Sequence, residues 1–304
     1  MIPRAPQPEQ RKLRRVTLDI VPELPEVETI ARGLAQRVTG DVIESVWLGS
    51  KPEPLKSPAR LIAETLENSR ISSVHRQGKH IVIELERDGS RRRKPRLKAK
   101  ATTKDRAQWI VHLGMTGQLL VTSPDADLAK HTHAVAKLAS GRELRFVDPR
   151  RFGRLCVITG EQFEAGGAEP LDVGLDTFIR LFRGRKTPIK SALLNQKLLR
   201  GVGNIYADEA LFRAGIRPRR RASTITRVQF EKLYRSVQQV LKEAIEAGGS
   251  SVNDYVDSNG DPGSFQFQHR VYGREGEPCL VCRTPVKRVV IAGRSSHYCP
   301  KCQK

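Results

Sequence analysis

The sequence predicts an α+β protein, with strands in the N-terminal half, helices in the C-terminal half and a small cysteine-bearing unit at the end. Short stretches of alternating apolar and polar residues recur between residues 42 and 159, as in an antiparallel sandwich or barrel. From about residue 176 to 247 the apolar residues follow a helical period instead. Two CxxC pairs then occupy residues 279–282 and 299–302.

Length and charge bound the class of protein. A chain of 304 residues suggests roughly two domains of ~150 residues. Its 54 Lys and Arg against 33 acids give a net charge of +21, which favours a polyanionic partner, most commonly nucleic acid. A basic protein without such a partner and a protein of anionic membrane surfaces are the alternatives. Because no apolar run reaches about 18 residues, we expect no membrane-spanning helix.

The order of the segments suggests five regions. Residues 1–21 are rich in proline and charge, and lack the apolar core of a signal peptide, so we expect a disordered or mis-assigned extension. With only five cysteines the chain is no secreted disulfide scaffold, which indicates a reducing, cytoplasmic location. The expected regions after the extension are a β-sandwich domain, a hinge, a helical domain and a terminal finger, over 22–160, 161–175, 176–262 and 263–304.

The first element after the extension is predicted to be a helix. Within PELPEVETIARGLAQRV (22–38), four apolar residues fall on one helical face, and prolines and acids crowd the start, where a helix accepts them. A different segment, the basic stretch 90–106, interrupts the strands. It reads as an extended loop, which is either a solvated linker or a phosphate contact.

The four paired cysteines predict one structural zinc ion. Cys279, Cys282, Cys299 and Cys302 form a C-x2-C-x16-C-x2-C pattern, which lies within the spacing of zinc sites. Four thiolates close the tetrahedron and leave no position for a substrate, so the ion has no catalytic role. A redox function for the CxxC pairs is the less favoured alternative. Arg294 lies in the loop between the pairs.

Several segments together resemble the formamidopyrimidine-DNA glycosylases, bacterial enzymes that remove oxidised purines. The matching segments run in family order and include the four-cysteine ribbon: PELPEVET at 22–29, GKHIVIEL at 78–85, HLGMTGQL at 112–119, DPRRFG at 148–153, IKSALLNQKLLRGVGNIYADEALFRAGI at 189–216 and VYGREGEPC at 271–279. The resemblance implies a helix-two-turn-helix unit in the helical domain, double-stranded damaged DNA as partner, and a monomeric, nucleoid-associated enzyme.

The resemblance also implies four catalytic residues. Pro22 would attack C1′ of the damaged nucleotide with its secondary amine, and Glu23 would be the general acid that assists opening of the sugar ring. Lys79 would assist the first elimination, and Arg294 would clamp the phosphate in the second. The result would be excision of the base followed by β,δ-elimination at the abasic site. From the sequence alone, Glu23 could equally complement the helix dipole, with Glu26 in either role, and Lys79 and Arg294 could be solvated side chains.

A set of DNA contacts follows from the same resemblance. Met115, Arg150 and Phe152 would fill the hole left by the flipped base, although core packing is the alternative for Met115 and Phe152. Gly201 and Gly203 would let the backbone and Asn204 approach a phosphate. The further expected contacts are His112, His131, Arg151, Arg185, Lys190 and Tyr272. His131 with His133 could suggest a metal site, but the sequence offers no third ligand.

The position of Pro22 conflicts with its expected role. Its nitrogen belongs to the peptide bond with Val21, and an amide nitrogen is no nucleophile. We therefore expect that translation starts at a valine codon for residue 21, with later removal of the initiator, or that proteolysis removes residues 1–21. If Pro22 is never exposed, the alternative is a noncatalytic DNA-binding zinc protein on the same scaffold.

Overall fold

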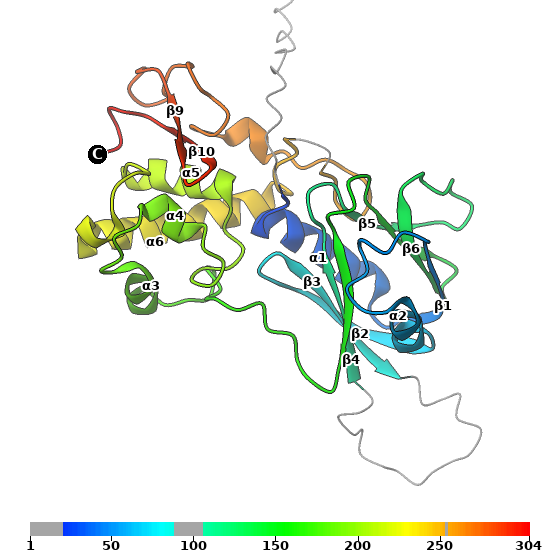
Figure 1. Ribbon diagram of the computed structural model, residues 1–304. Helices are drawn as coiled ribbons and strands as arrows, with labels where there is room; N and C mark the ends of the chain where they lie inside the picture. The colour runs from blue at the N-terminus through cyan, green and yellow to red at the C-terminus, as the bar shows by residue number, and fades with distance from the viewer. Residues whose placement is uncertain (1–20, 88–105, 253–254) are drawn as a thin grey trace, which may run out of the picture.

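The computed structural model describes residues 21–87, 106–252 and 255–304. The expected disorder of residues 1–20 and nearly all of the basic insert therefore lie outside the described residues. Figure 1 shows a strand-rich half and a helical half, with the terminal hairpin beside the helices. The strand-rich half contains α1 (Leu24–Val38), β1 (Val42–Leu48), α2 (Ala59–Leu66), β2 (Ser69–Gln77), β3 (His80–Arg87), β4 (Arg106–His112), β5 (Gln118–Thr122), β6 (Thr132–Leu138), β7 (Glu143–Val147) and β8 (Arg154–Thr159).

The eight strands form one antiparallel sheet. Their order is β5-β7-β6-β1-β2-β3-β4-β8, so the predicted sandwich is built from a single continuous sheet. The apolar face of α1 packs on this sheet, as its helical period predicts, and Ile30 and Leu34 are almost completely buried there. The α+β fold class expected from the sequence is confirmed.

The helical half has its own core. Its elements are α3 (Leu175–Phe182), α4 (Ile189–Leu193), α5 (Asn204–Ala214), η3 (Ala222–Thr224), α6 (Arg227–Glu246) and η4 (Phe265–Gln268). Aromatic side chains fill the centre, among them Phe178, Phe182, Tyr206 and Phe230. The long α6 begins at Thr226, whose hydroxyl accepts a hydrogen bond from the Gln229 amide and caps the helix. No helix among the described ranges is long and apolar enough to cross a membrane.

A two-stranded hairpin, β9 (Lys287–Ile291) and β10 (Arg294–Tyr298), carries the chain to its end. The tight turn between the strands consists of Ala292 and Gly293, both with positive φ, as the twist of a two-residue hairpin requires. The hairpin is fastened to the end of α5, because buried Gln303 donates to the Ile216 carbonyl at 2.8 Å and accepts from the Cys299 amide at 2.8 Å.

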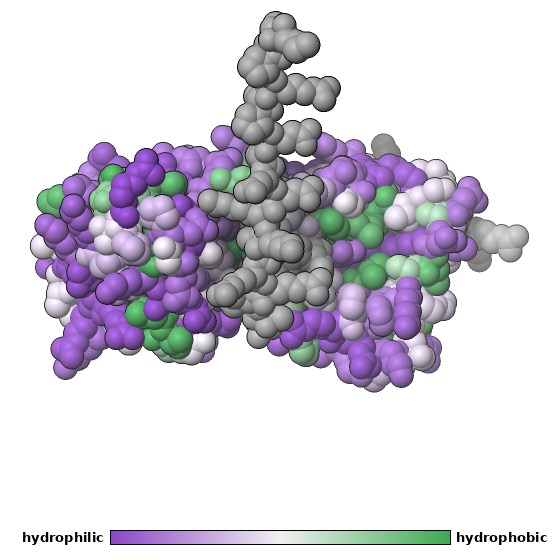
Figure 2. Space-filling view, turned by 90° about the horizontal axis from the view of Figure 1, so that it is seen from above, coloured by the Kyte–Doolittle hydropathy of each residue, from purple (hydrophilic) through white to green (hydrophobic). Residues whose placement is uncertain are grey.

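The start of α1 joins the two halves. Leu24 belongs to the core of the helical half, and its amide donates to the Gly201 carbonyl at 3.0 Å. A buried Arg76 reinforces the junction by pairing with Glu28 of α1 at 2.8 Å and with Glu169 of the connecting segment at 2.7 Å. Any group at the start of α1 is therefore enclosed by both halves. Seen from above, the surfaces of both halves are largely hydrophilic (Figure 2).

Candidate active site and zinc centre

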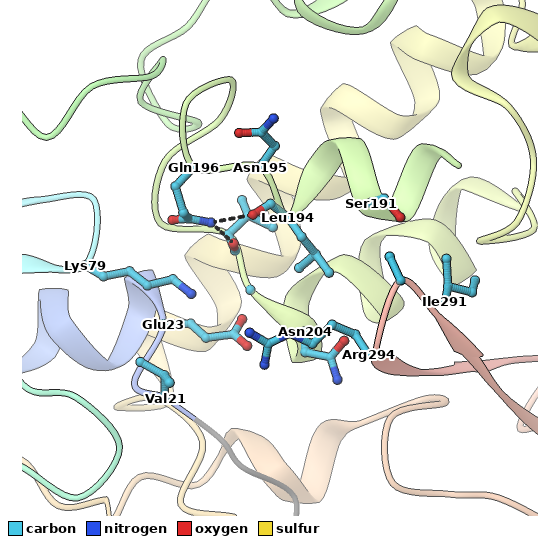
Figure 3. Close-up of a pocket in the computed structure, with 13 residues that line it drawn as sticks. Val21, Glu23, Lys79, Ser191, Leu194, Asn195, Gln196, Asn204, Ile291 and Arg294 are labelled. Atoms are coloured by element: carbon cyan, nitrogen blue, oxygen red, sulfur yellow. Dashed lines mark hydrogen bonds between the residues drawn. The ribbon is translucent and has the colours of Figure 1, made fainter. Parts of the chain in front are cut away.

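A pocket of about 290 Å³ lies where four segments meet. These are the start of α1, the turn between β2 and β3, the connection from α4 to α5, and the tip of the β9–β10 hairpin. Glu23 and Lys79 enter from the strand-rich half, while Asn204 and Arg294 enter from the other side (Figure 3). Residues distant in the sequence thus share one cavity, which is a common setting for an active site.

Glu23 is the buried acid of this pocket. Only 3% exposed, its carboxylate accepts hydrogen bonds from the first turn of α5, from the Ile205 amide at 3.1 Å and the Tyr206 amide at 3.5 Å. Burial raises its pKa to about 7, although the nearby Lys79 ammonium and these amides oppose the shift. A carboxyl group with this pKa can hold or release a proton near neutral pH, as general acid catalysis requires.

Gly203 permits this approach of Glu23 to α5. A Cβ atom on Gly203 would lie 2.2 Å from the Glu23 carboxyl carbon, so a side chain at this position would displace the acid. From the sequence we expected Gly201 and Gly203 to admit a phosphate. The structure instead places Glu23 against Gly203 and Leu24 against Gly201. These glycines serve the junction with α1.

Lys79 reaches the pocket from the tight turn after β2. Desolvation lowers its pKa, and the negative charges of Glu23 and Glu26 partly counteract that shift. The turn is held in place by Arg76, whose guanidinium donates to the Gly78 carbonyl at 3.1 Å. In Figure 3 the Lys79 amine points toward Glu23, so the amine and the carboxyl group, which can each exchange a proton, face the same space.

Pro22 is buried beside Glu23, and Val21 contributes to the wall of the pocket. The sequence expectation that Pro22 adjoins the acid therefore agrees with its place in the fold. In the chain as given, however, the Pro22 nitrogen still forms the amide bond to Val21.

Glu26 is hydrogen-bonded to the backbone of Glu23. Its carboxylate accepts from the Glu23 amide and from the Ser250 amide, both at 2.8 Å, and from the Tyr206 hydroxyl in a short hydrogen bond. Burial raises its pKa as well. Of the two roles left open for Glu26, the hydrogen bonds favour support of Glu23. Sequence reasoning missed Tyr206 and Ser250, because tyrosine and serine at those positions carry no motif.

Arg294 and Asn204 line the pocket beside Glu23 in Figure 3. Asn204 donates to the Ser295 hydroxyl at 3.1 Å, which ties the start of α5 to β10 directly after Arg294.

Lys190 takes a different place from the one expected. It is 1% exposed, and its amine lies 2.6 Å from an oxygen of buried Asp208 and donates to the Ser295 carbonyl at 2.6 Å. An ammonium enclosed in this way does not reach a phosphate. The expected DNA contact of Lys190 is corrected to an internal ion pair that fastens the hairpin. Tyr272, at 2% exposed, is likewise enclosed instead of presented to solvent.

Met115, Arg150 and Phe152 lie on two adjacent loops. Met115 is half-buried and Phe152 is 52% exposed, so the core-packing alternative does not describe Phe152. The Arg150 guanidinium carbon lies 4.9 Å from the centre of the Phe152 ring, within range of a cation–π contact.

His112 is the last residue of β4 and lies directly before the loop that carries Met115. Its Nδ1 accepts from the Gly114 amide at 3.1 Å, and its ring lies 5.0 Å from that of His80. Burial, helped by the neighbouring positive charges, lowers its pKa to about 3. His112 is therefore neutral at physiological pH, and its Nε2 carries the proton available to a ligand.

The remaining expected DNA contacts lie on the surface. His131, Arg151 and Arg185 are exposed, and Arg151 pairs with Glu53 at 2.7 Å. His133 is buried with its Nε2 3.0 Å from the Asp148 carbonyl, which gives it a structural partner. Within the described ranges, the four cysteines form the metal-binding group, and the two histidines do not join one.

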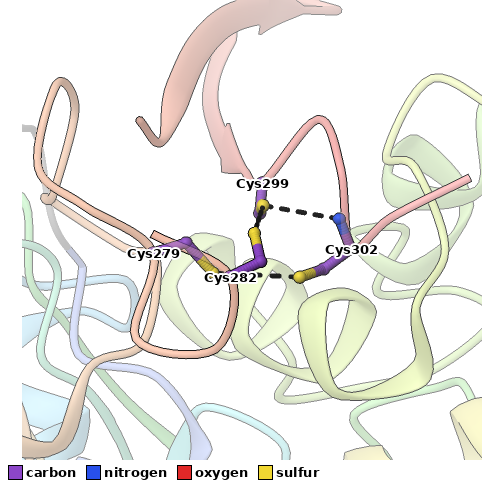
Figure 4. A group of neighbouring side chains, drawn as sticks. All are labelled: Cys279, Cys282, Cys299 and Cys302. Carbon is purple, nitrogen blue, oxygen red and sulfur yellow. Dashed lines mark hydrogen bonds between the residues drawn. The ribbon is translucent and has the colours of Figure 1, made fainter. Parts of the chain in front are cut away.

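The cysteine cluster fits one zinc ion. Its four sulfur atoms lie within 4.8 Å of one another, with Cys279 and Cys302 3.9 Å apart and Cys282 and Cys299 3.4 Å apart (Figure 4). Sulfur atoms on a tetrahedral zinc with Zn–S bonds of about 2.3 Å are about 3.8 Å apart. The ion is therefore structural, since four thiolates complete its coordination.

Comparison with known proteins agrees with this geometry. Three family models match in order: the formamidopyrimidine-DNA glycosylase N-terminal domain over residues 21–155, the H2TH domain of the same enzymes over 167–256, and the zinc finger found in FPG and IleRS over 276–304. The formamidopyrimidine-DNA glycosylase of Solibacter usitatus is 45% identical, and that of Thioalkalivibrio sulfidiphilus is 42% identical. In both cases 93% of this chain covers 100% of the relative.

Solved structures give the same result. The crystal structure of MutM (FPG) from Thermus thermophilus is 39% identical, with a TM-score of 0.77 over 93% of this chain and 98% of that one. Lactococcus lactis Fpg in complex with DNA containing an abasic site is 31% identical, with a TM-score of 0.81 over 93% and 99%. By its matched domains and its full-length relatives, the chain belongs to the formamidopyrimidine-DNA glycosylase family.

Proposed function

We propose that the chain removes oxidised purines, such as formamidopyrimidines and 8-oxoguanine, from double-stranded DNA and then cleaves the strand at the abasic site. The observation that carries this proposal is the pocket lined by Glu23, Lys79 and Arg294. Val21 also lines it, and buried Pro22 lies in the chain between Val21 and Glu23. Relatives with the same fold were solved with Fapy-dG DNA, abasic-site DNA and carbocyclic 8-oxo-G DNA. We further propose that the enzyme acts as a monomer.

In the first step, the free amine of Pro22 attacks C1′ of the damaged nucleotide. As the bond from nitrogen to C1′ forms, the bond between C1′ and the base breaks, and the proton that the Pro22 nitrogen loses goes to the departing base. Protonated Glu23 gives its proton to the ring oxygen as the bond between C1′ and that oxygen breaks and the sugar opens. The resulting iminium needs no further proton to stay cationic, so it withdraws electrons from C2′. The pKa of about 7 supports this role, because Glu23 can deliver a proton and take one back at neutral pH.

Two eliminations complete the reaction. In the β-elimination, loss of a C2′ proton expels the 3′ phosphate. In the δ-elimination, loss of a second proton from the sugar expels the 5′ phosphate, which leaves a one-nucleotide gap. The lowered pKa of Lys79 suits a group that exchanges protons with the substrate. The Arg294 guanidinium can donate two parallel hydrogen bonds to one phosphate, so it holds the departing phosphate. His112, Asn204, Arg185, His131 and Arg151 are proposed to contact the DNA backbone.

The active form must lack the peptide bond between Val21 and Pro22. The N-terminal family model begins at residue 21, and 93% of the chain covers the full length of the relatives, which supports a start at this point. Initiation at residue 21 followed by removal of the initiator residue, or proteolysis that removes residues 1–21, would each supply the free amine.

A borohydride trap tests the proposal. A form that begins at Pro22 is mixed with abasic-site or 8-oxoguanine duplex DNA and reduced, and the adduct is mapped by mass spectrometry. We expect one covalent adduct at Pro22. Tight DNA binding without an adduct from this trimmed form would favour the noncatalytic alternative. Intact mass of an active preparation gives a second test, since an active chain that retains residues 1–21 contradicts the proposed start.

A further inference from the structure

One buried carboxylate connects the two loops that carry Met115, Arg150 and Phe152. These loops, residues 113–117 and 148–153, are called the wedge loops below. Asp148 is completely buried at the start of the second loop. One of its oxygens accepts from the Thr116 hydroxyl at 2.5 Å and from the Arg150 amide at 3.2 Å, and the other accepts from the Gly153 amide at 2.7 Å.

Thr116 is the only member of this set that lies on the first wedge loop. Its hydroxyl donates to Asp148 and also accepts from the Arg150 amide at 3.2 Å. A single hydroxyl group therefore links the residue next to Met115 with the backbone of Arg150. Because Asp148 and Thr116 bond to each other and both accept from the Arg150 amide, the link connects the two loops at more than one point.

The backbones of the wedge loops also touch. A Cβ atom on Gly114 would lie 2.5 Å from the Gly153 nitrogen, so the loops approach more closely than side chains would allow. Arg151 has a φ of 58°, an unfavourable value for a residue with a side chain. Such a conformation persists only when neighbouring contacts hold it, and the bonds of Asp148 on both sides of Arg151 supply them.

If Met115, Arg150 and Phe152 fill the hole left by a flipped base, as the resemblance implies, side chains from both loops must enter the duplex together. An error of about 1 Å in the position of a reacting or supporting group can lower a rate by about 100-fold. Loops that are already fixed lose less conformational freedom when they enter DNA. The arrangement of these loops before DNA arrives therefore affects how readily a base is extruded.

We propose that Asp148, acting through Thr116, is a positioning residue that holds the wedge loops in register for insertion into the duplex. The proposal rests on the proposed function and on the role in filling the hole that the family resemblance implies for Met115, Arg150 and Phe152. It assigns Asp148 and Thr116 no contact with the reacting atoms. Its consequence is selective: removal of a base should depend on the link more than reaction at a site that has already lost its base, where less stacking is broken.

Thr116→Val tests the link, because valine keeps the shape of threonine and removes the hydroxyl. Single-turnover rates are measured with the Pro22-start form on 8-oxoguanine duplex and on abasic-site duplex. We compare the rate on 8-oxoguanine duplex divided by the rate on abasic-site duplex. This ratio should fall by about tenfold in Thr116→Val and further in Asp148→Asn, and it should stay near the parent value in Thr116→Ser. Fluorescence of 2-aminopurine placed beside the lesion reports insertion of the wedge loops. Insertion should be slower in Thr116→Val and slowest in Asp148→Asn.

Thr65→Val is the matched control. The Thr65 hydroxyl donates to the Leu61 carbonyl at 2.6 Å within α2, away from the wedge loops, so this variant also loses one buried hydrogen bond. An unchanged rate ratio in Thr116→Val would overturn the proposal, as would an equal loss on both substrates accompanied by a lower melting temperature. Failure of the proposed chemistry is distinguishable, because the parent itself would then give no borohydride adduct. Failure of the wedge would appear as an unchanged rate ratio in Phe152→Ala.

Discussion

The start of α1 and the β9–β10 hairpin form opposite walls of one pocket, but they are built on different physical principles. At the start of α1, burial raises the pKa of Glu23 to about 7 and lowers the pKa of Lys79. In the hairpin, four cysteines close a metal site and the Lys190–Asp208 ion pair fastens the strand that follows Arg294. We propose that the desolvated wall at the start of α1 carries proton transfer and that the hairpin wall binds phosphate.

The largest expected effect concerns the Pro22 amine. A form that retains any residue before Pro22 should lose strand cleavage by at least about 10³-fold relative to the Pro22-start form, because an amide cannot form the iminium. Gel-based cleavage assays and borohydride trapping measure this loss. DNA affinity, measured in parallel, should persist. Equal cleavage by both forms would show that the Pro22 amine is not the nucleophile.

The next effect concerns the two neighbouring glutamates of α1. Glu23→Gln should slow base excision by about 10²- to 10⁴-fold, the range that a general acid supplies, with little change in thermal stability. Single-turnover kinetics measure the rate. Glu26→Gln provides the contrast: it replaces an acceptor of three buried hydrogen bonds, so we expect about 1–3 kcal/mol lower stability. If the two variants behaved alike, the division between proton transfer and support would be wrong.

The hairpin wall is tested through its metal. Cys279→Ser should lower the DNA affinity by about 10- to 100-fold and lose the bound zinc, because metal binding supplies folding energy to the hairpin. Zinc content and fluorescence anisotropy with duplex DNA report both effects. Cys156→Ser is the control, since Cys156 is a half-buried cysteine of β8 outside the cluster. DNA affinity that survives loss of zinc would contradict the proposed role of the hairpin.

The smallest effect is the dependence on pH. The pKa of Glu23 is raised from 4.5 to about 7, so the folded protein binds a proton that the unfolded chain has released between these values. The stability contributed by this group is therefore complete below about pH 4.5 and is lost as pH rises toward 7. Excision by the protonated acid should also decline above about pH 7.

Glu23→Gln isolates this contribution. Denaturant unfolding between pH 5 and 8 should show a shallower pH dependence for the variant than for the parent, by less than about 1.4 kcal/mol per pH unit. Parallel curves for the two proteins would show that Glu23 does not titrate in this window.

Much of the fold was predictable from the sequence because local patterns specify it. The period of α1, the alternation in the strands and the cysteine spacing each require only neighbouring residues, and each corresponds to an element or centre in the structure. The bounds of the domains stay predictions.

The environment of the site was less accessible to sequence reasoning. The burial of Lys190 could not be foreseen, because its partner Asp208 lies one helix further along the chain and basic residues are usually exposed. The contact between Gly203 and Glu23 could not be foreseen either, since Glu23 comes from the opposite end of the sequence. The phosphate role expected for Gly203 stays a prediction.

The sequence by itself determined the family resemblance, the zinc ligands and the candidate chemistry at Pro22, because residue identity and spacing decide which reactions are available. Only the tertiary structure decided which acid is poised near neutral pH. Glu23 and Glu26 are three residues apart and chemically identical. Glu23 faces the pocket and Lys79, whereas Glu26 is saturated by the Tyr206 hydroxyl and two backbone amides. Desolvation and hydrogen bonding depend on three-dimensional surroundings, which no local pattern encodes.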